Sequence, residues 1–302
     1  MIIMFRIKKH IAVLTACVLA VITLCACTSG TKTETTAAPA AKTEVPSVNG
    51  EYKTTVLKTG KSDAIILETT GGTMVIDCGE ENDGDEVVEY LKANGITKVD
   101  YLVITHFDQD HVGGAAEVIS NLSIGEIITP DYAGSNSEYT NFITAASNAN
   151  YSITRLTESK TVTLGDVLFE IYPPLKSSYS ESDNDYSIVD KATHGSDTFL
   201  YAGDAELERL KELYNQVDLD VDFLKVPHHG RIDTESANFI KAVSPKYAVV
   251  TCSKKEGADE ELMSLLSAAN AATYLNRDGT ITAVSTGSGI TVTQAAADTS
   301  AE

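Results

Sequence analysis

Short apolar runs alternate with polar turns along most of the chain after residue 51. Apolar blocks of about four to eight residues bounded by turn residues indicate β-strands, whereas apolar positions three or four residues apart indicate helices. A Gly71-Gly72 pair between two such blocks predicts a tight hairpin. The first half therefore predicts strands at residues 52–57, 64–68, 73–77, 101–104 and 124–128, and helices at residues 86–93, 115–121 and 136–149.

The second half also combines strands and helices, and a turn at residues 194–197 joins two of the strands. The pattern predicts strands at residues 167–172, 186–192, 198–201, 223–226, 247–251, 273–275, 280–284 and 290–293, and helices at residues 206–214, 235–243 and 259–269. A run of strands followed by alternating helices and strands predicts two sheets packed face to face with helices outside. The expected fold class is α/β (α+β), a four-layer αββα sandwich.

The N-terminal segment has a different pattern. Basic residues precede an apolar stretch at residues 11–24, which is too short for a comfortable membrane-spanning helix and indicates an export signal. Leu-Cys-Ala-Cys at residues 24–27 resembles a bacterial lipobox, which implies cleavage before Cys27 and lipidation of its thiol. A second match ends at Cys17 but leaves a shorter apolar core, so we favour Cys27. A retained anchor helix would tether the protein to the same membrane face.

These patterns divide the chain into four parts. Residues 1–26 form a lipoprotein signal peptide, and residues 27–50 have the Thr- and Ala-rich composition of a disordered tether. Residues 51–294 form the folded domain, and residues 295–302 form a disordered tail. We therefore expect a lipoprotein of the cell membrane, with its domain on the extracytoplasmic face.

The chain is strongly acidic. Its formal net charge is −20 at pH 7, and loss of the signal peptide removes three basic residues and no acidic one, which leaves about −23. Because nonspecific nucleic-acid binding depends on Lys and Arg that displace counterions, DNA or RNA would need a local basic patch or bound metals. Cys78 and Cys252 remain in the domain; they could pair, but we expect both as small core residues.

One short segment concentrates candidate metal ligands directly after the apolar run at residues 101–104. Residues 105–114 read Thr-His-Phe-Asp-Gln-Asp-His-Val-Gly-Gly, with the candidate ligands at His106, Asp108, Asp110 and His111. Packing gives no reason to gather imidazoles and carboxylates, whereas divalent metals need such donors converging on one point. The segment therefore indicates a metal-dependent hydrolase.

Further polar groups also stand at the ends of apolar strands. They are Asp204 after Gly203, the His228-His229 pair, and the trio at residues 183–185. A site assembled along one edge of a sandwich requires this placement, because a ligand must leave the core without disturbing strand pairing.

At these positions the chain resembles the metallo-β-lactamase superfamily, and more closely the hydrolase domain of ComEC-type competence proteins. The similarity covers nearly all of residues 52–293 and rests on the order and spacing of several motifs. The motifs are Gly-Lys-Ser-Asp-Ala at residues 60–64, Ile-Asp-Cys-Gly at 76–79, the block at 105–114, Asn-Asp-Tyr-Ser at 184–187, Gly-Asp-Ala-Glu at 203–206, Leu-Lys-Val-Pro-His-His-Gly at 224–230, and Asp-Gly-Thr-Ile at 278–281.

The resemblance implies a site for two divalent metal ions. The implied ligands are His106 and Asp108 for one metal, Asp110 and His111 for the other, and Asp204 as the bridge between them. A histidine of the His228-His229 pair closes the second site, and we favour His229 because the superfamily ligand usually precedes the glycine. The pair could instead form a turn held by backbone bonds, and Asp204 could cap the helix that follows it.

The chain departs from the pattern of many relatives at two places. Asp108 replaces a histidine, and the trio at residues 183–185 replaces an isolated histidine; Asn184 and Asp185 are therefore possible auxiliary residues. Additional oxygen donors shift the preference from zinc toward manganese, so both metals remain candidates. His194 could be the missing ligand, although we expect an exposed turn residue there.

Two close cations would lower the pKa of a bridging water and present hydroxide to a substrate, with Asp110 and Asp204 orienting that nucleophile. A phosphate ester fits best: either DNA, through the resemblance, or a wall- or lipid-linked molecule such as a phosphorylcholine ester, through the membrane tether. Arg231 and Arg277 are cations near these motifs that could bind the phosphate group, whereas we interpret Lys225 as surface charge. The competing hypothesis is a metal-binding lipoprotein without turnover, and no protein partner is inferred.

Overall fold

The computed structural model describes residues 43–180 and 183–296. From Glu44 onward these residues form one compact unit. The expected signal peptide, Cys27 and nearly all of the expected tether lie outside the described residues, as do residues 297–302. No helix within the described ranges is both long and apolar enough to cross a membrane.

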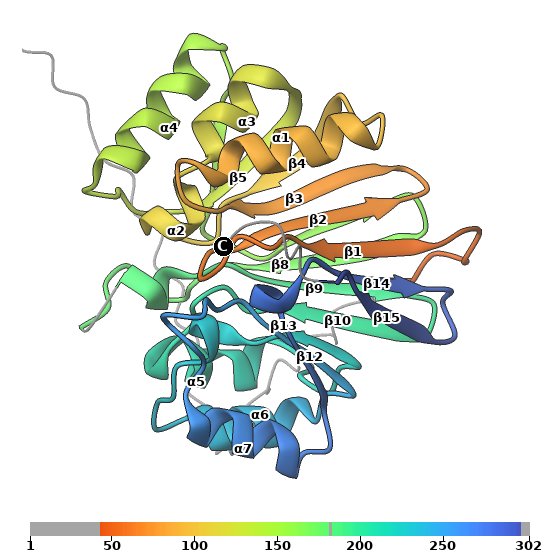
Figure 1. The fold of residues 1–302 in the computed structure, drawn as a ribbon. Helices are drawn as coiled ribbons and strands as arrows, with labels where there is room; N and C mark the ends of the chain where they lie inside the picture. Colours follow the sequence, from red (N-terminus) through yellow and green to blue (C-terminus); the bar gives the residue numbers. More distant parts are fainter. Residues whose placement is uncertain (1–42, 181–182, 297–302) are drawn as a thin grey trace, which may run out of the picture. The chain divides into compact units, whose positions relative to one another are not determined.

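The first sheet has eight strands in the order β15-β14-β1-β2-β3-β4-β5-β6 (Figure 1). Strands β1 to β3 are antiparallel neighbours, whereas β3 to β6 run parallel and are connected through helices. The strands are β1 (Tyr52–Val56), β2 (Ala64–Thr69), β3 (Gly72–Cys78), β4 (Lys98–Val103), β5 (Ser123–Pro130), β6 (Ile153–Leu156), β14 (Ile281–Ser285) and β15 (Ile290–Gln294). The helices are α1 (Asp83–Ala93), α2 (Gln109–Val112), α3 (Ala115–Asn121) and α4 (Ser137–Asn148).

The second sheet has seven strands in the order β13-β12-β11-β10-β9-β8-β7. Strands β7 to β10 are antiparallel neighbours, and β10 to β13 run parallel. The strands are β7 (Lys160–Leu164), β8 (Val167–Tyr172), β9 (Val189–His194), β10 (Asp197–Tyr201), β11 (Phe223–Lys225), β12 (Tyr247–Val250) and β13 (Ala272–Leu275). The helices are α5 (Leu207–Gln216), α6 (Ser236–Val243) and α7 (Glu260–Ala268).

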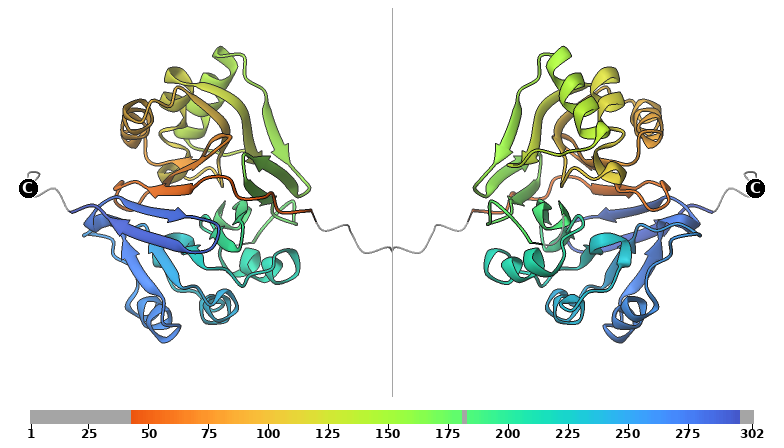
Figure 2. Two further views of the ribbon diagram at one scale, coloured as in Figure 1. Left: turned by 90° about the vertical axis from the view of Figure 1, so that its right-hand side faces the viewer. Right: turned by 90° about the vertical axis from the view of Figure 1, so that its left-hand side faces the viewer.

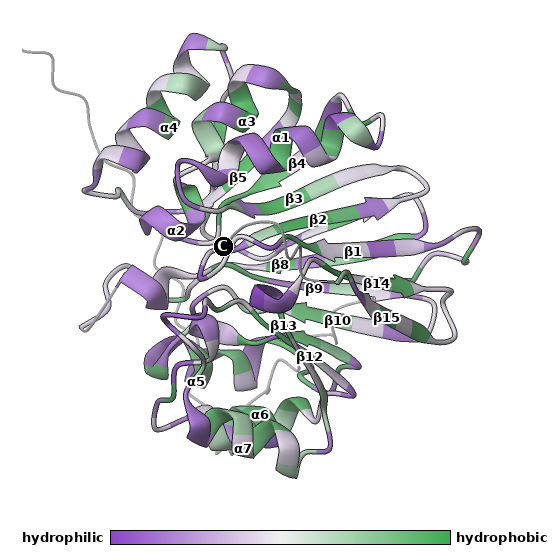
Figure 3. Cartoon of the chain, in the orientation of Figure 1, coloured by the Kyte–Doolittle hydropathy of each residue, from purple (hydrophilic) through white to green (hydrophobic). Residues whose placement is uncertain are grey.

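The two sheets pack face to face, and each outer face is covered by helices (Figures 1 and 2). Strand β2 shows why: Ile65 and Leu67 pack between the sheets, while Ala64 and Ile66 pack beneath the helices, because successive side chains of a strand point to opposite faces. Figure 3 shows this for β2, most of which is coloured green for hydrophobic residues. A third apolar cluster lies between the second sheet and α5 to α7. The predicted αββα sandwich is confirmed.

Several local predictions differ from the structure. The strand expected at residues 186–192 starts later, because Asp183–Tyr186 forms a short 3-10 helix before β9. Strands β6 and β7 were not predicted, since each is a short outermost strand whose polar residues dilute the apolar pattern. Cys78 and Cys252 are free and fully buried, which confirms them as core residues.

The expectation of an exposed His194 is wrong. His194 is the last residue of β9 and is completely buried. Its Nδ1 lies 2.7 Å from the hydroxyl oxygen of Ser285, and its Nε2 lies 3.3 Å from Asp166 Oδ2. The turn needs only Gly195, with φ of 59°, and Ser196, so His194 stays in the strand. The imidazole joins a structural polar network instead of an exposed turn.

Asp190 is a buried carboxyl group between the sheets. It lies on the same face of β9 as Ala192, which packs in the central core, and opposite Tyr201 of β10. Neither of its carboxyl oxygens has a hydrogen-bond partner within the described ranges. Burial, with a smaller contribution from the Asp77 charge, raises the pKa of Asp190 well above its ordinary value. The folded protein therefore binds a proton here more tightly than the unfolded chain does.

Replacement of Asp190 by Asn should change how stability depends on pH. A carboxyl group with a raised folded-state pKa loses stability as the pH rises above its unfolded pKa, whereas an amide does not titrate. Between about pH 4 and pH 7, the melting temperature of Asp190→Asn should gain roughly 2–8 °C relative to wild type. Differential scanning fluorimetry across this range measures the effect, and parallel melting curves for the two proteins would contradict it.

Candidate metal centre

The turn after β4 carries four of the expected ligands. Because β3 and β4 are parallel, their carboxyl ends meet at one edge of the first sheet. Asp77, near the end of β3, accepts hydrogen bonds from the backbone N and hydroxyl of Thr105 at 2.8 and 2.6 Å. This fixes the start of the turn. His106 follows fully buried, and the single turn of α2 places Asp110 and His111 side by side.

The second sheet supplies the remaining groups from the same edge of the sandwich. Asp204 follows β10 and His229 follows β11, and these two strands are parallel neighbours. The backbone N of Asp204 donates to the Ser187 hydroxyl at 3.1 Å. His228 and His229 have φ values of 46° and 53°, an uncommon conformation for residues other than glycine. This tight turn directs His229 toward the turn after β4.

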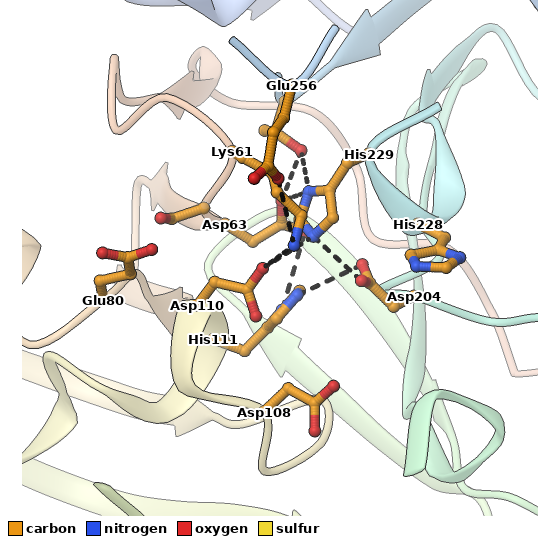
Figure 4. A network of polar contacts seen from close by, with 12 residues as sticks. Lys61, Asp63, Glu80, Asp108, Asp110, His111, Asp204, His228, His229 and Glu256 are labelled. Carbon is orange, nitrogen blue, oxygen red and sulfur yellow. Dashed lines mark hydrogen bonds and ion pairs between the residues drawn. The ribbon is translucent and has the colours of Figure 1, made fainter. Parts of the chain in front are cut away.

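Asp110, His111, Asp204 and His229 lie close together (Figure 4), and the buried His106 joins His111 and Asp204, so that five side chains converge. His111 Nε2 lies 3.3 Å from Asp204 Oδ1, and His229 Nε2 lies 3.0 Å from Asp204 Oδ2 and 3.3 Å from Asp110 Oδ2. Ligand atoms of His106, His111 and Asp204 lie within 4.8 Å of one another, as do those of Asp110, His111 and His229. The two groups overlap at His111, and Asp204 faces members of both.

This arrangement is unfavourable unless something binds to it. Four buried atoms of these five side chains lack a hydrogen-bond partner within the described ranges: Nε2 of His106, His111 and His229, and Oδ1 of Asp204. Leaving a buried polar group without a partner costs about 1–3 kcal/mol. Nitrogen and oxygen donors directed at a common point are the ligand set of a divalent metal. The residues present therefore fit a metal site.

Asp108 and His228 lie at the edge of this cluster. The Asp108 side chain is 44% exposed, and its Oδ2 lies 3.7 Å from His106 Nε2, so it can complete the cluster from the open side. His228 Nδ1 instead lies 2.8 Å from Glu206 Oε1, and Figure 4 shows His228 separated from His111 by Asp204. The geometry favours His229 over His228 as the ligand.

Two buried carboxylates support the imidazoles from behind. Asp77 Oδ2 lies 2.7 Å from His111 Nδ1. Asp63 Oδ1 accepts a hydrogen bond from the Thr251 hydroxyl at 2.6 Å, and that hydroxyl lies 3.0 Å from His229 Nδ1. Metal-binding histidines commonly use their second ring nitrogen in this way, which fixes the ring orientation. Both aspartates stand in motifs seen in the sequence, but only the structure reveals their role.

The interpretation of Lys225 as surface charge is wrong. Its side chain is fully buried, and its Nζ lies 2.5 Å from Asp63 Oδ2 and 3.4 Å from the carbonyl oxygen of Gly203. A buried charge is tolerated only when it is paired, and Lys225 balances Asp63 inside the fold. The ion pair holds Asp63 beneath the cluster and does not face the solvent.

Asp185 has a structural role at the start of α5. Its Oδ1 accepts hydrogen bonds from the backbone N of Glu206 at 3.2 Å and of Arg209 at 3.0 Å. These bonds satisfy backbone groups at the helix N-terminus. The auxiliary role of Asp185 at the site stays a prediction. The helix-cap alternative for Asp204 is wrong, because the N-cap position of α5 is Glu206.

The other two auxiliary candidates lie beside the cluster and not within it. Asn184 Nδ2 is 3.4 Å from His228 Nε2, which places the amide next to the peripheral histidine. Arg231 is 38% exposed, and its Nη1 lies 3.4 Å from Asp259 Oδ1.

Neighbouring opposite charges shift the pKa values of the ionisable side chains in the cluster. Burial disfavours the imidazolium form, but Asp204 and Asp77 outweigh it and hold the pKa of His111 well above its usual value. Burial lowers the pKa of His229, but Asp204 and Asp110 have a larger opposite effect, so the pKa of His229 is also raised. Burial opposes ionisation of Asp204, yet His229 and His111 hold the pKa of that carboxyl well below its usual value. Protons therefore occupy positions that a cation would take.

A cleft of about 610 Å³ opens over this region and is lined by Asp108 and Asp110. One wall is the loop between β1 and β2, in which Lys61 Nζ lies 2.9 Å from Asp110 Oδ2. The opposite rim includes Lys255 and Glu256. Lys61 stands in the Gly-Lys-Ser-Asp-Ala motif at residues 60–64, but its contact with Asp110 is visible only in the structure.

Comparison with known proteins supports the interpretation of the cluster as a metal site. Residues 57–176 match the family model of the metallo-beta-lactamase superfamily. The chain is 25% identical over 228 residues to ComE operon protein 3 of Bacillus subtilis (strain 168), covering 69% of this chain and 29% of that protein. It is also 27% identical over 204 residues to competence protein ComA of Neisseria gonorrhoeae, covering 67% and 27%. The chain thus spans less than a third of the length of these relatives.

Solved structures with this fold include two similar chains. The metallo-beta-lactamase fold protein YhfI from Bacillus subtilis has a TM-score of 0.53 at 10% identity, covering 80% of this chain and 100% of that chain. An E377D mutant of the CmlA beta-hydroxylase has a TM-score of 0.50 at 13% identity, covering 75% and 52%. At these identities the similarity shows the fold alone.

Asp77→Asn should weaken metal binding without unfolding the protein. Asp77 has φ of 56°, a conformation that Asn tolerates well, but the amide cannot replace the carboxylate behind His111. Metal affinity, measured against a competing chelator, should fall about 10- to 100-fold. Asp222→Asn is the control, because Asp222 accepts a hydrogen bond from the backbone N of Thr198, away from the cluster. Equal affinity in both variants would contradict the supporting role.

Metal binding should release protons at neutral pH. The raised pKa values of His111 and His229 mean that a cation must displace protons, so affinity should fall as the pH decreases. Calorimetric titration with zinc or manganese in buffers of different ionisation enthalpy should show release of about one proton or more per protein. Binding without proton release near pH 7 would contradict this prediction.

Proposed function

Since the chain belongs to the metallo-β-lactamase superfamily and is related to the ComEC-type competence proteins, we propose that it is a metal-dependent hydrolase of phosphodiesters. The observation that carries the proposal is the convergence of unpartnered ligand atoms from both sheets beside an open cleft. Such a site can hold cations deep enough to exclude most water while one side stays open to a substrate.

Bound divalent cations would lower the pKa of the reacting water and neutralise charge that develops on a phosphate. Within the chain, Asp110 and Asp204 would orient that water, because each directs a carboxylate oxygen toward the cluster. Asp204 is the proposed bridge, since its two oxygens face different imidazoles. The proposed metal ligands are His106, Asp108, Asp110, His111, Asp204 and His229.

We propose two divalent ions, either zinc or manganese. Three imidazole nitrogens favour zinc, whereas the carboxylates of Asp108, Asp110 and Asp204 suit a harder ion such as manganese. The ring orientations set by Asp77 and by Thr251 serve either metal, because they act on the histidines.

The acidity of the chain bears on the substrate. A formal charge of −20 repels a long polyanion at a distance, whereas a single phosphate can still be bound by cations at the site. The curated relatives are named as competence proteins, which supports DNA as one candidate. The charge favours a second candidate of the same reaction class, a phosphate ester on a wall- or lipid-linked molecule such as a phosphorylcholine ester.

The proposed location is the extracytoplasmic face of the cell membrane, through a lipid on Cys27. The chain enters the domain where the backbone N of Asn49 donates to Asp166 Oδ2 at 2.8 Å. Asp166 precedes β8 and contacts His194 at the end of β9, whereas the metal cluster lies near the start of β9. The cleft therefore opens at the strand ends opposite the point where the chain enters.

The purified protein, loaded with zinc or manganese, should hydrolyse bis-p-nitrophenyl phosphate. Asp110→Ala should reduce kcat by about 100-fold or more, because it removes a group that orients the reacting water. His229→Ala should lose both bound metal and turnover, whereas His228→Ala, the matched control, should keep its metal content. Release of p-nitrophenol and elemental analysis provide the two measurements.

The outcomes separate the hydrolase from a metal-binding lipoprotein without turnover. Stoichiometric metal with no hydrolysis of any phosphodiester would contradict the proposed activity. Loss of metal from His228→Ala but not from His229→Ala would contradict the proposed ligand set.

A further inference from the structure

Lys61 occupies an unusual position at the boundary between the metal cluster and the cleft. Its Nζ lies 2.9 Å from Asp110 Oδ2, the same oxygen that lies 3.3 Å from His229 Nε2. Among the residues that the structure describes, no other lysine or arginine forms an ion pair with the five converging ligands. Its side chain remains 34% exposed and lines the cleft.

The loop that carries Lys61 is fixed to the metal-binding turn. The backbone N of Asp63 donates to the carbonyl oxygen of Asp110 at 3.1 Å, and the Thr59 hydroxyl donates to the carbonyl oxygen of Ser62 at 2.9 Å. Gly60, with φ of 71°, provides the turn that precedes Lys61. The ammonium group is therefore presented by an ordered loop and not by a freely moving one.

Lys61 has donors to spare for a ligand in the cleft. An ammonium group has three N–H donors, and Asp110 accepts one of them. Glu256 Oε2 lies 3.9 Å from Nζ, beyond hydrogen-bond distance, and the Glu256 side chain is 54% exposed. Figure 4 shows Lys61 near Asp110 and Glu256, and all three residues line the cleft. A ligand oxygen in the cleft can therefore accept a hydrogen bond from this ammonium group.

We propose that Lys61 binds a non-bridging oxygen of the substrate's phosphate and thereby selects for anionic esters. This inference deepens the proposed function and rests on it. Besides Lys61 and Lys255, the charged residues of the cleft lining are acidic (Glu80, Asp83, Asp108, Asp110 and Glu256), so an anion needs a compensating cation beside the metals. A charge-assisted hydrogen bond from Lys61 supplies both attraction and orientation.

The test compares Lys61→Met, Lys61→Arg and Lys255→Met as metal-loaded proteins. Lys255 lines the same cleft and has no ion pair within the described ranges, so its substitution is the matched control. Calorimetry measures binding of inorganic phosphate, and elemental analysis measures metal content. Lys61→Met should weaken phosphate binding about tenfold or more, while Lys61→Arg and Lys255→Met stay within about threefold of wild type.

Two substrates distinguish anion binding from support of Asp110. With unchanged metal content, Lys61→Met should lower kcat/KM for bis-p-nitrophenyl phosphate about 10- to 100-fold and lower hydrolysis of neutral p-nitrophenyl acetate by less than about threefold. Equal losses on both substrates, loss of metal, or unchanged phosphate binding would overturn the inference. Phosphate binding needs no turnover, so it tests Lys61 even if the protein hydrolyses no diester.

Discussion

The structure depends on one unfavourable juxtaposition, the burial of three imidazole Nε2 atoms and a carboxylate oxygen against one another without hydrogen-bond partners within the described ranges. Desolvation opposes this arrangement, and either protons on the imidazoles or a bound cation offsets its cost. The surrounding fold holds it in place through Asp77 behind His111 and through Thr251 and Asp63 behind His229. These contacts keep the ligand side chains oriented for a cation, at a local cost to the free energy of folding.

The sandwich explains why the site lies where it does. Parallel strands in both sheets end at one edge, and the turns after β4, β10 and β11 leave the core there. Each turn therefore releases a ligand without disturbing strand pairing. The helices cover the outer faces, so this edge stays open as the cleft over Asp108 and Asp110. Specificity then depends on the loops that border the cleft, including the one that carries Lys61.

The sequence predicted features that depend on local pattern or on a shared motif. The αββα layers followed from hydrophobic periodicity, and the crowded segment His106 to His111 marked a metal site on chemical grounds. Partners across the two sheets were not predictable in this way. Thr251 and Asp63 are 188 residues apart, and the burial of Lys225 follows only from its contact with Asp63. His194 was misread for the same reason, since its partners Ser285 and Asp166 lie far from it in the sequence.

Anomalous X-ray diffraction from crystals of the protein grown with zinc or manganese tests the central claim most directly. The account predicts anomalous peaks within about 2.0–2.3 Å of Nε2 of His106, His111 and His229, with Asp204 placed between two peaks. Peaks located only at surface carboxylates, or an ordered cluster that excludes metal at saturating concentration, would contradict it.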